Sequence, residues 1–319
     1  MFQFSYSSNA FLVIFVWFCV LCALMLTNEL TRKFKWVGFC AFFILPIILT
    51  VLWFTVLRDS LYIGWFHMVK VYTATITCMG FWFIRYYSKK INWKFVMFFP
   101  PAILAINILQ AVFRDFELGF TYSGMGPVFN EGAGAMIIAG SWNFMNGVAG
   151  ILNIIAITGF TGIVLRKVTD NDRSKSILWP DMVWFFIIAY NFWNFAYVYN
   201  AIPHRSWYNG LALLIAPTII AFTTGKGSWV QHRGHTLALW VYFALTFPIF
   251  LDDSIWSVNS AYNPTVQFIV SLVSLLSNVA IVCFMIYKWR TTGRNPYTSE
   301  VYTDMKESQA IRAMANQDK

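Results

Sequence analysis

Polar side chains interrupt the long apolar stretches of this sequence at the spacing of one helix face. In residues 178–201, Tyr190, Asn194 and Tyr197 stand at i, i+4 and i+7. Unpaired amides and phenols are costly against lipid tails, so we expect this face to turn toward other helices or toward a water-filled cavity. Side chains of these types can bind a small polar solute through hydrogen bonds.

Three cationic side chains are predicted in or beside the same half of the membrane: His67, Lys70 and Arg205. Ionisable residues within membrane helices are functional candidates by default, and these three would favour an anionic group on a solute. A structural role is the alternative. Lys70 lies about 10 Å below the outer boundary by helix rise, so its ammonium can extend to the surface, and His67 can be a hydrogen-bonded packing residue.

Further amides lie in the same external half. Asn143 and Asn146 stand beside Gly147 and Gly150, so close helix packing is the alternative to a binding role there. The residues predicted to bind a substrate are His67, Lys70, Gln110, Asn143, Asn146, Tyr190, Asn194, Tyr197 and Arg205. The charged groups expected near the mouth of this pocket are Glu131, His204, Arg205, Asp252 and Asp253.

Other chemical motifs are weak. The sequence GKGS at 225–228 lacks the glycine spacing of a Walker loop. His232 and His235 form HxxH in a predicted cytoplasmic loop, without a nearby carboxylate or cysteine. Cys19 and Cys22 have no second pair and no histidine beside them. We predict no metal site, and the sequence does not identify a cofactor.

The composition indicates a membrane protein. Of the 319 residues, 58% are hydrophobic and 12% are charged, whereas soluble domains carry about 25% charged residues. We predict an all-α polytopic integral membrane helical bundle of about nine transmembrane helices. Residues 1–290 form this domain and 291–319 a polar cytoplasmic tail. The predicted spans are residues 9–28, 36–57, 63–84, 94–113, 141–165, 178–201, 207–224, 236–251 and 264–288.

The basic residues predict the topology. With the N-terminus outside and the C-terminus cytoplasmic, 19 of the 23 Lys and Arg residues lie in cytoplasmic segments and three in external loops, with Lys70 inside a helix. The net charge of +9 therefore reflects orientation and not a nucleic-acid partner. The first ten residues contain no Lys or Arg, unlike a secretory signal. We expect the protein to lie in the plasma (inner) membrane.

One external connection is long. Residues 114–140 are rich in glycine, and AMIIAG at 135–140 is too short to cross a bilayer. This piece is either a re-entrant segment or the irregular start of the next helix. In the tail, residues 299–317 are compatible with a short helix.

Three functions fit these observations. The first is a permease or channel-like carrier for a small polar or anionic solute, with its pocket in the extracytoplasmic half of the bilayer. The second is a membrane-embedded enzyme acting on a lipid or polyprenyl substrate, with His67, His204, Glu131 and Asp252 as acid and base groups. The third is a non-catalytic scaffold or sensor that signals through the tail. The expected partners are the lipid bilayer and a small-molecule solute; the sequence does not define an oligomeric state.

Overall fold

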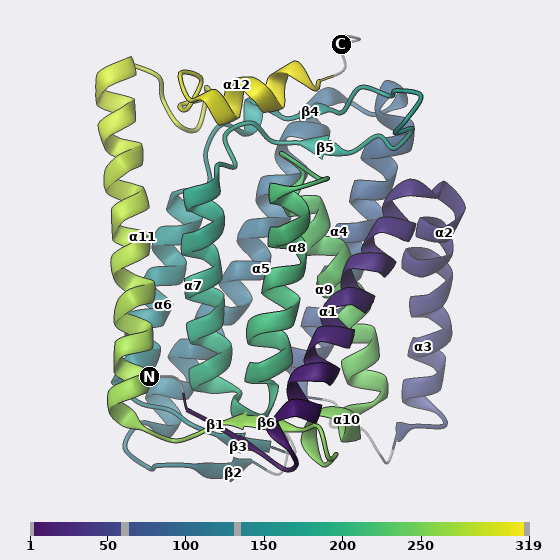
Figure 1. Ribbon diagram of the computed structural model, residues 1–319. Coiled ribbons are helices and arrows are strands. Elements are labelled where there is room, and N and C mark those ends of the chain that lie inside the picture. Colours follow the sequence, from purple (N-terminus) through teal and green to yellow (C-terminus); the bar gives the residue numbers. More distant parts are fainter. Residues whose placement is uncertain (1–2, 59–63, 131–134, 316–319) are drawn as a thin grey trace.

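Long helices run side by side in one bundle, with short strand pairs at its two ends (Figure 1). The computed structural model describes residues 3–58, 64–130 and 135–315. Strand β1 and helix α12 lie at opposite ends of the bundle, and we call these the β1 end and the α12 end (Figure 1).

The helices follow the order of the predicted apolar stretches, with two π-helical segments, η1 and η6, running directly into α3 and α8. Their bounds are α1 Ala10–Lys33, α2 Lys35–Phe39, η1 Cys40–Ile44, α3 Leu45–Phe54, α4 Trp65–Tyr87, α5 Trp93–Tyr122, α6 Ser141–Ile155, α7 Trp184–Ala201, η6 Tyr208–Ala212, α8 Leu213–Phe222, α9 Trp229–Thr246, α10 Pro248–Asp252, α11 Pro264–Thr292 and α12 Lys306–Ala313.

Three antiparallel strand pairs close the ends of the bundle. At the β1 end, β1 (Phe4–Tyr6) pairs with β6 (Val258–Ser260), and β2 (Val128–Asn130) pairs with β3 (Ala135–Ile137). At the α12 end, β4 (Val164–Leu165) pairs with β5 (Ile177–Leu178). The segment 135–140, expected to be re-entrant or helical, therefore contributes the second strand of a pair and then the N-cap of α6.

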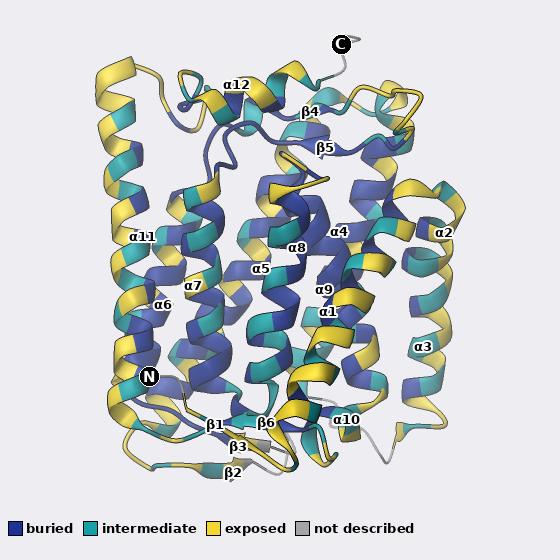
Figure 2. Ribbon diagram, in the orientation of Figure 1, coloured by how far each residue is buried: buried dark blue, intermediate teal, exposed yellow. Residues whose placement is uncertain are grey.

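The outer surface of the bundle is apolar between its two ends. Four helical stretches of the described chain are long and apolar enough to cross a bilayer: Ala10–Lys33, Lys35–Phe54, Trp93–Tyr122 and Pro264–Thr292. Exposed positions run along α1, α3 and α11 (Figure 2), and they include large side chains such as Phe11 and Ile47. Water would not tolerate so large an apolar surface, whereas lipid would. The helices are thus compatible with an integral membrane protein.

Helix α6 is shorter than predicted, because the helix expected over 141–165 ends at Ile155. Gly159 follows with a left-handed φ of 61°, which L-residues other than glycine rarely adopt. A Cβ at Gly159 would also lie 2.1 Å from an Asp181 carboxylate oxygen. The apolar residues after 155 therefore form a 3-10 turn and β4 beneath the tail, and not the last turns of a helix.

Helices α5 and α9 also differ from prediction. α5 continues nine residues past the expected end at 113, and so it includes Asp115. α9 begins at Trp229 and not at 236, which moves His232, Arg233 and His235 from a predicted loop into the helix. All three of these side chains are buried.

The tail packs across the α12 end of the bundle. The Asp181 carboxylate, just before α7, accepts hydrogen bonds from the backbone N–H groups of Val301 (2.7 Å) and Tyr302 (3.4 Å). Burial raises the pKa of Asp181 to about 6, although these two bonds oppose the shift. Glu307 of α12 accepts from the backbone N–H of Trp184 at 3.2 Å, at the first turn of α7. The tail is therefore held by specific contacts with the bundle.

Candidate functional site

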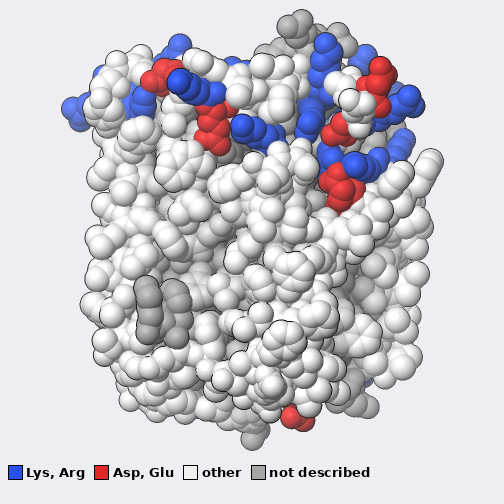
Figure 3. All heavy atoms as spheres, viewed as in Figure 1, with Lys and Arg blue, Asp and Glu red and all other residues white. Residues whose placement is uncertain are grey.

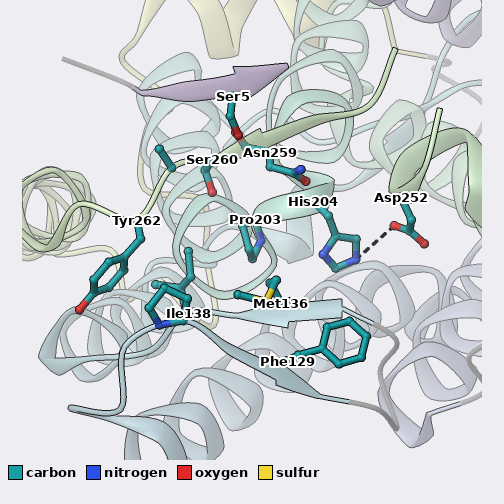
Figure 4. Close-up of a pocket in the computed structure, with 12 residues that line it drawn as sticks. Ser5, Phe129, Met136, Ile138, Pro203, His204, Asp252, Asn259, Ser260 and Tyr262 are labelled. Carbon is teal, nitrogen blue, oxygen red and sulfur yellow. Dashed lines mark hydrogen bonds and ion pairs between the residues drawn. The ribbon is translucent and has the colours of Figure 1, made fainter. Parts of the chain in front are cut away.

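A cavity of about 360 Å³ opens at the β1 end. Strands β1 and β6, the β2–β3 pair, the 3-10 turn η5 (Pro203–Arg205) and α10 form its walls (Figure 4). A volume of this size is within the range of small-molecule sites. The lining residues are Ser5, Pro127, Phe129, Met136, Ile138, Pro203, His204, Asp252, Asn259, Ser260, Ala261 and Tyr262.

Two prolines begin the short helices that carry the charged groups of this cavity. Pro203 starts η5 just after α7, and Pro248 starts α10 just after α9. Proline is well suited to a first helical position, because its φ is preset and its missing N–H would have no helical partner. The two starts bring His204 and Asp252 to the same wall (Figure 4).

Asp252 lies between two basic side chains. Its carboxylate oxygens are 3.6 Å from His204 Nε2 and 3.6 Å from Arg205 Nη2. Burial lowers the pKa of His204 well below its ordinary value, and nearby Arg205 and His67 lower it further. The His204 imidazole is therefore neutral at pH 7, and Arg205 is the charged partner of Asp252.

Arg205 of η5 also lines a second cavity, of about 70 Å³. His67 and Lys70 of α4 line it together with Arg205, so the structure brings these three predicted site residues together. Lys70 Nζ donates to Asn107 of α5, to the backbone oxygen at 3.2 Å and to Oδ1 at 3.4 Å. His67 Nδ1 and Arg205 Nε have no hydrogen-bond partner among the described residues. Arg205 Nε is therefore a donor without an acceptor, whereas His67 Nδ1 is a donor or an acceptor according to its tautomer.

Gln110 lies beside this cluster at the contact between α4 and α5. Its Oε1 accepts from Thr73 Oγ1 at 3.3 Å. One turn away along α5, Asn107 Nδ2 donates to Thr77 Oγ1 at 3.4 Å. These bonds hold α4 against α5 below Lys70, and Gln110 does not line either cavity.

Asn143 and Asn146 form a separate cluster around Asp115. Their Nδ2 atoms donate to the two carboxylate oxygens of Asp115, at 2.9 and 2.8 Å. Ser274 of α11 donates to Asn146 Oδ1 at 2.7 Å. All four side chains are fully buried, so this cluster joins α5, α6 and α11 and does not line the two cavities.

The stripe of helix α7 is buried among other helices. Tyr190 packs edge-on against Trp229, with 4.8 Å between ring centroids. The Tyr197 ring lies 6.1 Å from that of Phe66, and its hydroxyl has no hydrogen-bond partner among the described residues. Asn194 is also buried. These three side chains lie apart from the walls of the two cavities at the β1 end.

The groups expected at the mouth are placed in part. His204, Arg205 and Asp252 converge as described, whereas Asp253 is exposed at the end of α10. Glu131 lies outside the described residues. No group of three or more His, Cys, Asp or Glu side chains in the described part of the chain is arranged to hold a metal ion.

Asp115 was not predicted as a site residue, because the predicted span 94–113 ends two residues before it. A usable indication was present: Arg114 and Glu117 stand at i and i+3 and pair at 2.8 Å, and apolar residues continue at helical spacing beyond them. In the structure Glu117 is exposed and Asp115 is buried, so these two carboxylates lie on different faces of α5.

The sequence analysis also missed a polar cluster at the α12 end. His232 Nδ1 lies 3.1 Å from Asn28 Nδ2 and 3.3 Å from Asn28 Oδ1 of α1, and His235 Nδ1 lies 3.4 Å from Thr31 Oγ1. Asn28 and Thr31 stand three residues apart on α1, as His232 and His235 do on α9. This shared spacing of three residues could have predicted that the two histidines lie on a helix that packs against α1.

Comparison with known proteins gives one match. A model described as a family of unknown function (DUF5692) matches residues 7–314. No curated protein matches the chain, and no solved structure does. The matched region includes every described helix from α1 to α12, all of the 70 Å³ cavity, and every lining residue of the 360 Å³ cavity except Ser5. The chain belongs to the DUF5692 family.

Proposed function

We propose that this chain is a carrier of about nine membrane spans that admits a small polar or anionic solute through the cavity at the β1 end. The α12 end faces the cytoplasm and the β1 end faces outward. Each of the nine predicted apolar stretches overlaps a described helix, and this overlap supports the count of about nine spans.

The charge distribution supports the orientation. Charged side chains gather at the α12 end, and the middle of the face shown is free of them (Figure 3). Arg32, Arg85 and Lys175 are among the basic residues at that end, whereas Arg58, Arg114 and Arg205 belong to segments near the β1 end. Basic residues favour the cytoplasmic side of a membrane.

One observation carries the proposal: residues of the turn η5 line both cavities, and each of the two contains polar groups. Pro203 and His204 line the 360 Å³ cavity, and Arg205 lines the 70 Å³ cavity with His67 and Lys70. The Asp252 carboxylate of the larger cavity lies 3.6 Å from Arg205, so the charged groups of the two cavities are neighbours. Arg205 Nε, a donor without a described partner, and the Lys70 ammonium favour a solute with an anionic group.

Transport by the purified full chain tests the proposal. The protein is reconstituted into liposomes in sodium gluconate, and currents are recorded on a solid-supported membrane after jumps of acetate, lactate, succinate or phosphate. We expect at least one of these anions to give a current, and Lys70→Met to reduce it by at least about tenfold, because a hydrogen bond to a charged group is lost. Lys306→Met, on the exposed face of α12, is the matched control and should leave the current unchanged.

Two results would contradict the proposal. One is the absence of current for all four anions with folded wild-type protein. The other is an undiminished current from folded Lys70→Met.

The contact between His204 and Asp252 favours a second candidate function, a membrane-embedded enzyme acting on a lipid or polyprenyl substrate. A neutral imidazole held near a carboxylate can serve as a general base, and both side chains line the larger cavity. Liposomes containing phospholipids and a polyprenyl phosphate, incubated with the protein and analysed by mass spectrometry, test it. If the protein is such an enzyme, new lipid products should form with wild type and should be absent with His204→Gln. If the lipids are the same with and without the protein, they are not its substrates.

A further inference from the structure

Arg233 of α9 is a buried cation without a protein counter-ion. Its side chain is 5% exposed, and its Nε and Nη1 atoms have no hydrogen-bond partner among the described residues. None of the ion pairs in the described chain includes it. Arg32, at the α12 end, is equally buried but pairs with Glu29 at 2.6 Å and Asp172 at 3.0 Å. Arg32 therefore has carboxylate partners, whereas Arg233 has none among the described residues.

Arg233 lines a third cavity, of about 20 Å³, between helices α4, α5, α7 and α9. Thr77, Asn107, Tyr190 and Gly234 contribute to its walls. This volume exceeds the roughly 10–15 Å³ that one water-sized occupant needs. The cavity lies in the interior of the helices, because Thr77 and Asn107 stand near the middle of α4 and α5.

A second cation is close to this cavity. Lys70 Nζ donates to Asn107, which forms part of the wall. Asn107 Nδ2 and Thr77 Oγ1 already donate to Ile103 and Thr73 at 2.8 and 2.7 Å. Among the described side chains of the wall, Arg233 alone carries a charge, and its Nε and Nη1 are donors without a described partner. A low-dielectric region with two cations and no described carboxylate stabilises an anion.

We propose that Arg233 binds one small inorganic anion of about the size of chloride in this cavity. The site is distinct from the two cavities at the β1 end, and the inference goes beyond the proposed transport function because it does not require solute entry. Neutralising the guanidinium removes the cost of an unpaired charge among the helices. The competing account is structural: the guanidinium carbon lies 5.8 Å from the Tyr190 ring centroid, within range of a cation–π contact.

Anion-dependent stability separates the two accounts. The full-length protein is purified in sodium gluconate, and its thermal midpoint is followed as chloride replaces gluconate at constant ionic strength. An anion that binds only the folded state raises the midpoint in a saturable way. We expect this rise in wild type and in Arg290→Gln, an exposed matched control on α11, and its loss in Arg233→Gln.

Direct binding covers the case in which Arg233→Gln does not fold. Equilibrium binding of radiolabelled chloride to wild-type protein should saturate at about one ion per chain, and Arg233→Lys, which keeps the charge but not the guanidinium geometry, should weaken it by at least about tenfold. No saturable binding by wild type would overturn the proposal. So would a chloride-dependent rise in Arg233→Gln equal to that of wild type, because chloride would then act at another site and the cation–π contact would be the role left for Arg233.

Discussion

Asp115 illustrates how a single buried carboxylate can join three helices. It accepts one hydrogen bond from each of two amides of α6, and one of these amides accepts from Ser274 of α11. Asparagines at helix spacing beside glycines predict close packing or a binding site equally well. The acceptor that shows these asparagines to be packing residues is Asp115. It was not placed in a helix because the predicted span ended before it.

Replacing Asp115 should therefore weaken the bundle. Asp115→Leu leaves the Nδ2 groups of Asn143 and Asn146 without their acceptor, and we expect it to lower the free energy of unfolding by about 2 kcal/mol or more. Unfolding in detergent titrated with SDS measures this change. Glu117→Leu, which removes an exposed carboxylate that pairs with the partly buried Arg114, is the control and should cost less than about 1 kcal/mol. Equal losses in the two variants would contradict the role assigned to Asp115.

Asp172, in the loop before β5, should make the stability of the protein depend on pH. Burial opposes its ionisation, but hydrogen bonds from Ser174 and Arg32 outweigh burial and lower the pKa from 3.8 to about 2. The unfolded chain then binds more protons between these values, so the stability contributed by Asp172 is complete above about pH 4 and is lost as the pH falls through about 2.

The measurement is a comparison of wild type with Asp172→Asn over pH 6 to pH 3. The stability difference should be constant from pH 6 to about pH 5 and should shrink toward pH 3. A difference that stays constant to pH 3 would mean that the carboxylate keeps its ordinary pKa.

At the scale of elements, the long apolar stretches predicted which helices are present, but they did not predict where each helix begins and ends. The apolar run at 141–165 continues through Gly159, and nothing local shows that Asp181 will occupy the space of a Cβ there. Conversely, the polar sequence before 236 suggested a loop, but Asn28 and Thr31 of α1 lie against His232 and His235 and let the helix begin at Trp229. Both errors arose from contacts with residues far apart in sequence.

The same limit applies to the candidate site. The cationic group of His67, Lys70 and Arg205 could be proposed from depth alone, because all three lie near the β1 end of their elements. The cavity that Figure 4 shows could not, because β2–β3 and η5 form its walls and their packing has no helical periodicity. Short strands and turns carry little sequence pattern of their own.

The contacts of α12 make the tail part of the folded unit, and this gives a prediction about truncation. Deleting residues 295–319 removes the backbone donors to Asp181 and the Glu307 carboxylate at Trp184. We expect the midpoint of thermal unfolding of the purified protein to fall. Lys306→Ala, at an exposed position of α12, should leave the midpoint unchanged. An unchanged midpoint after deletion would show that the tail is held weakly and would favour a role in binding partners.

At the scale of the whole molecule, most of the basic residues and the two cavities lie at opposite ends of the bundle. The α12 end holds most of the described Lys and Arg residues, and the two cavities open near the β1 end. Basic residues are retained on the cytoplasmic side during insertion. The cavities should therefore face the outside of the cell or organelle that contains the protein.

Site-directed cysteine labelling tests this orientation. After the five native cysteines are replaced, single cysteines are introduced at Ser123, an exposed position after α5 near the β1 end, and at Thr169, an exposed position in the loop after β4 at the α12 end. A membrane-impermeant maleimide added to intact cells should label the Ser123→Cys protein at once. It should label the Thr169→Cys protein only after the membrane is opened, because the proposed topology has one span, α6, between these two positions. Labelling of both from outside, or of Thr169→Cys alone, would contradict the predicted topology and with it the outward opening of the cavity.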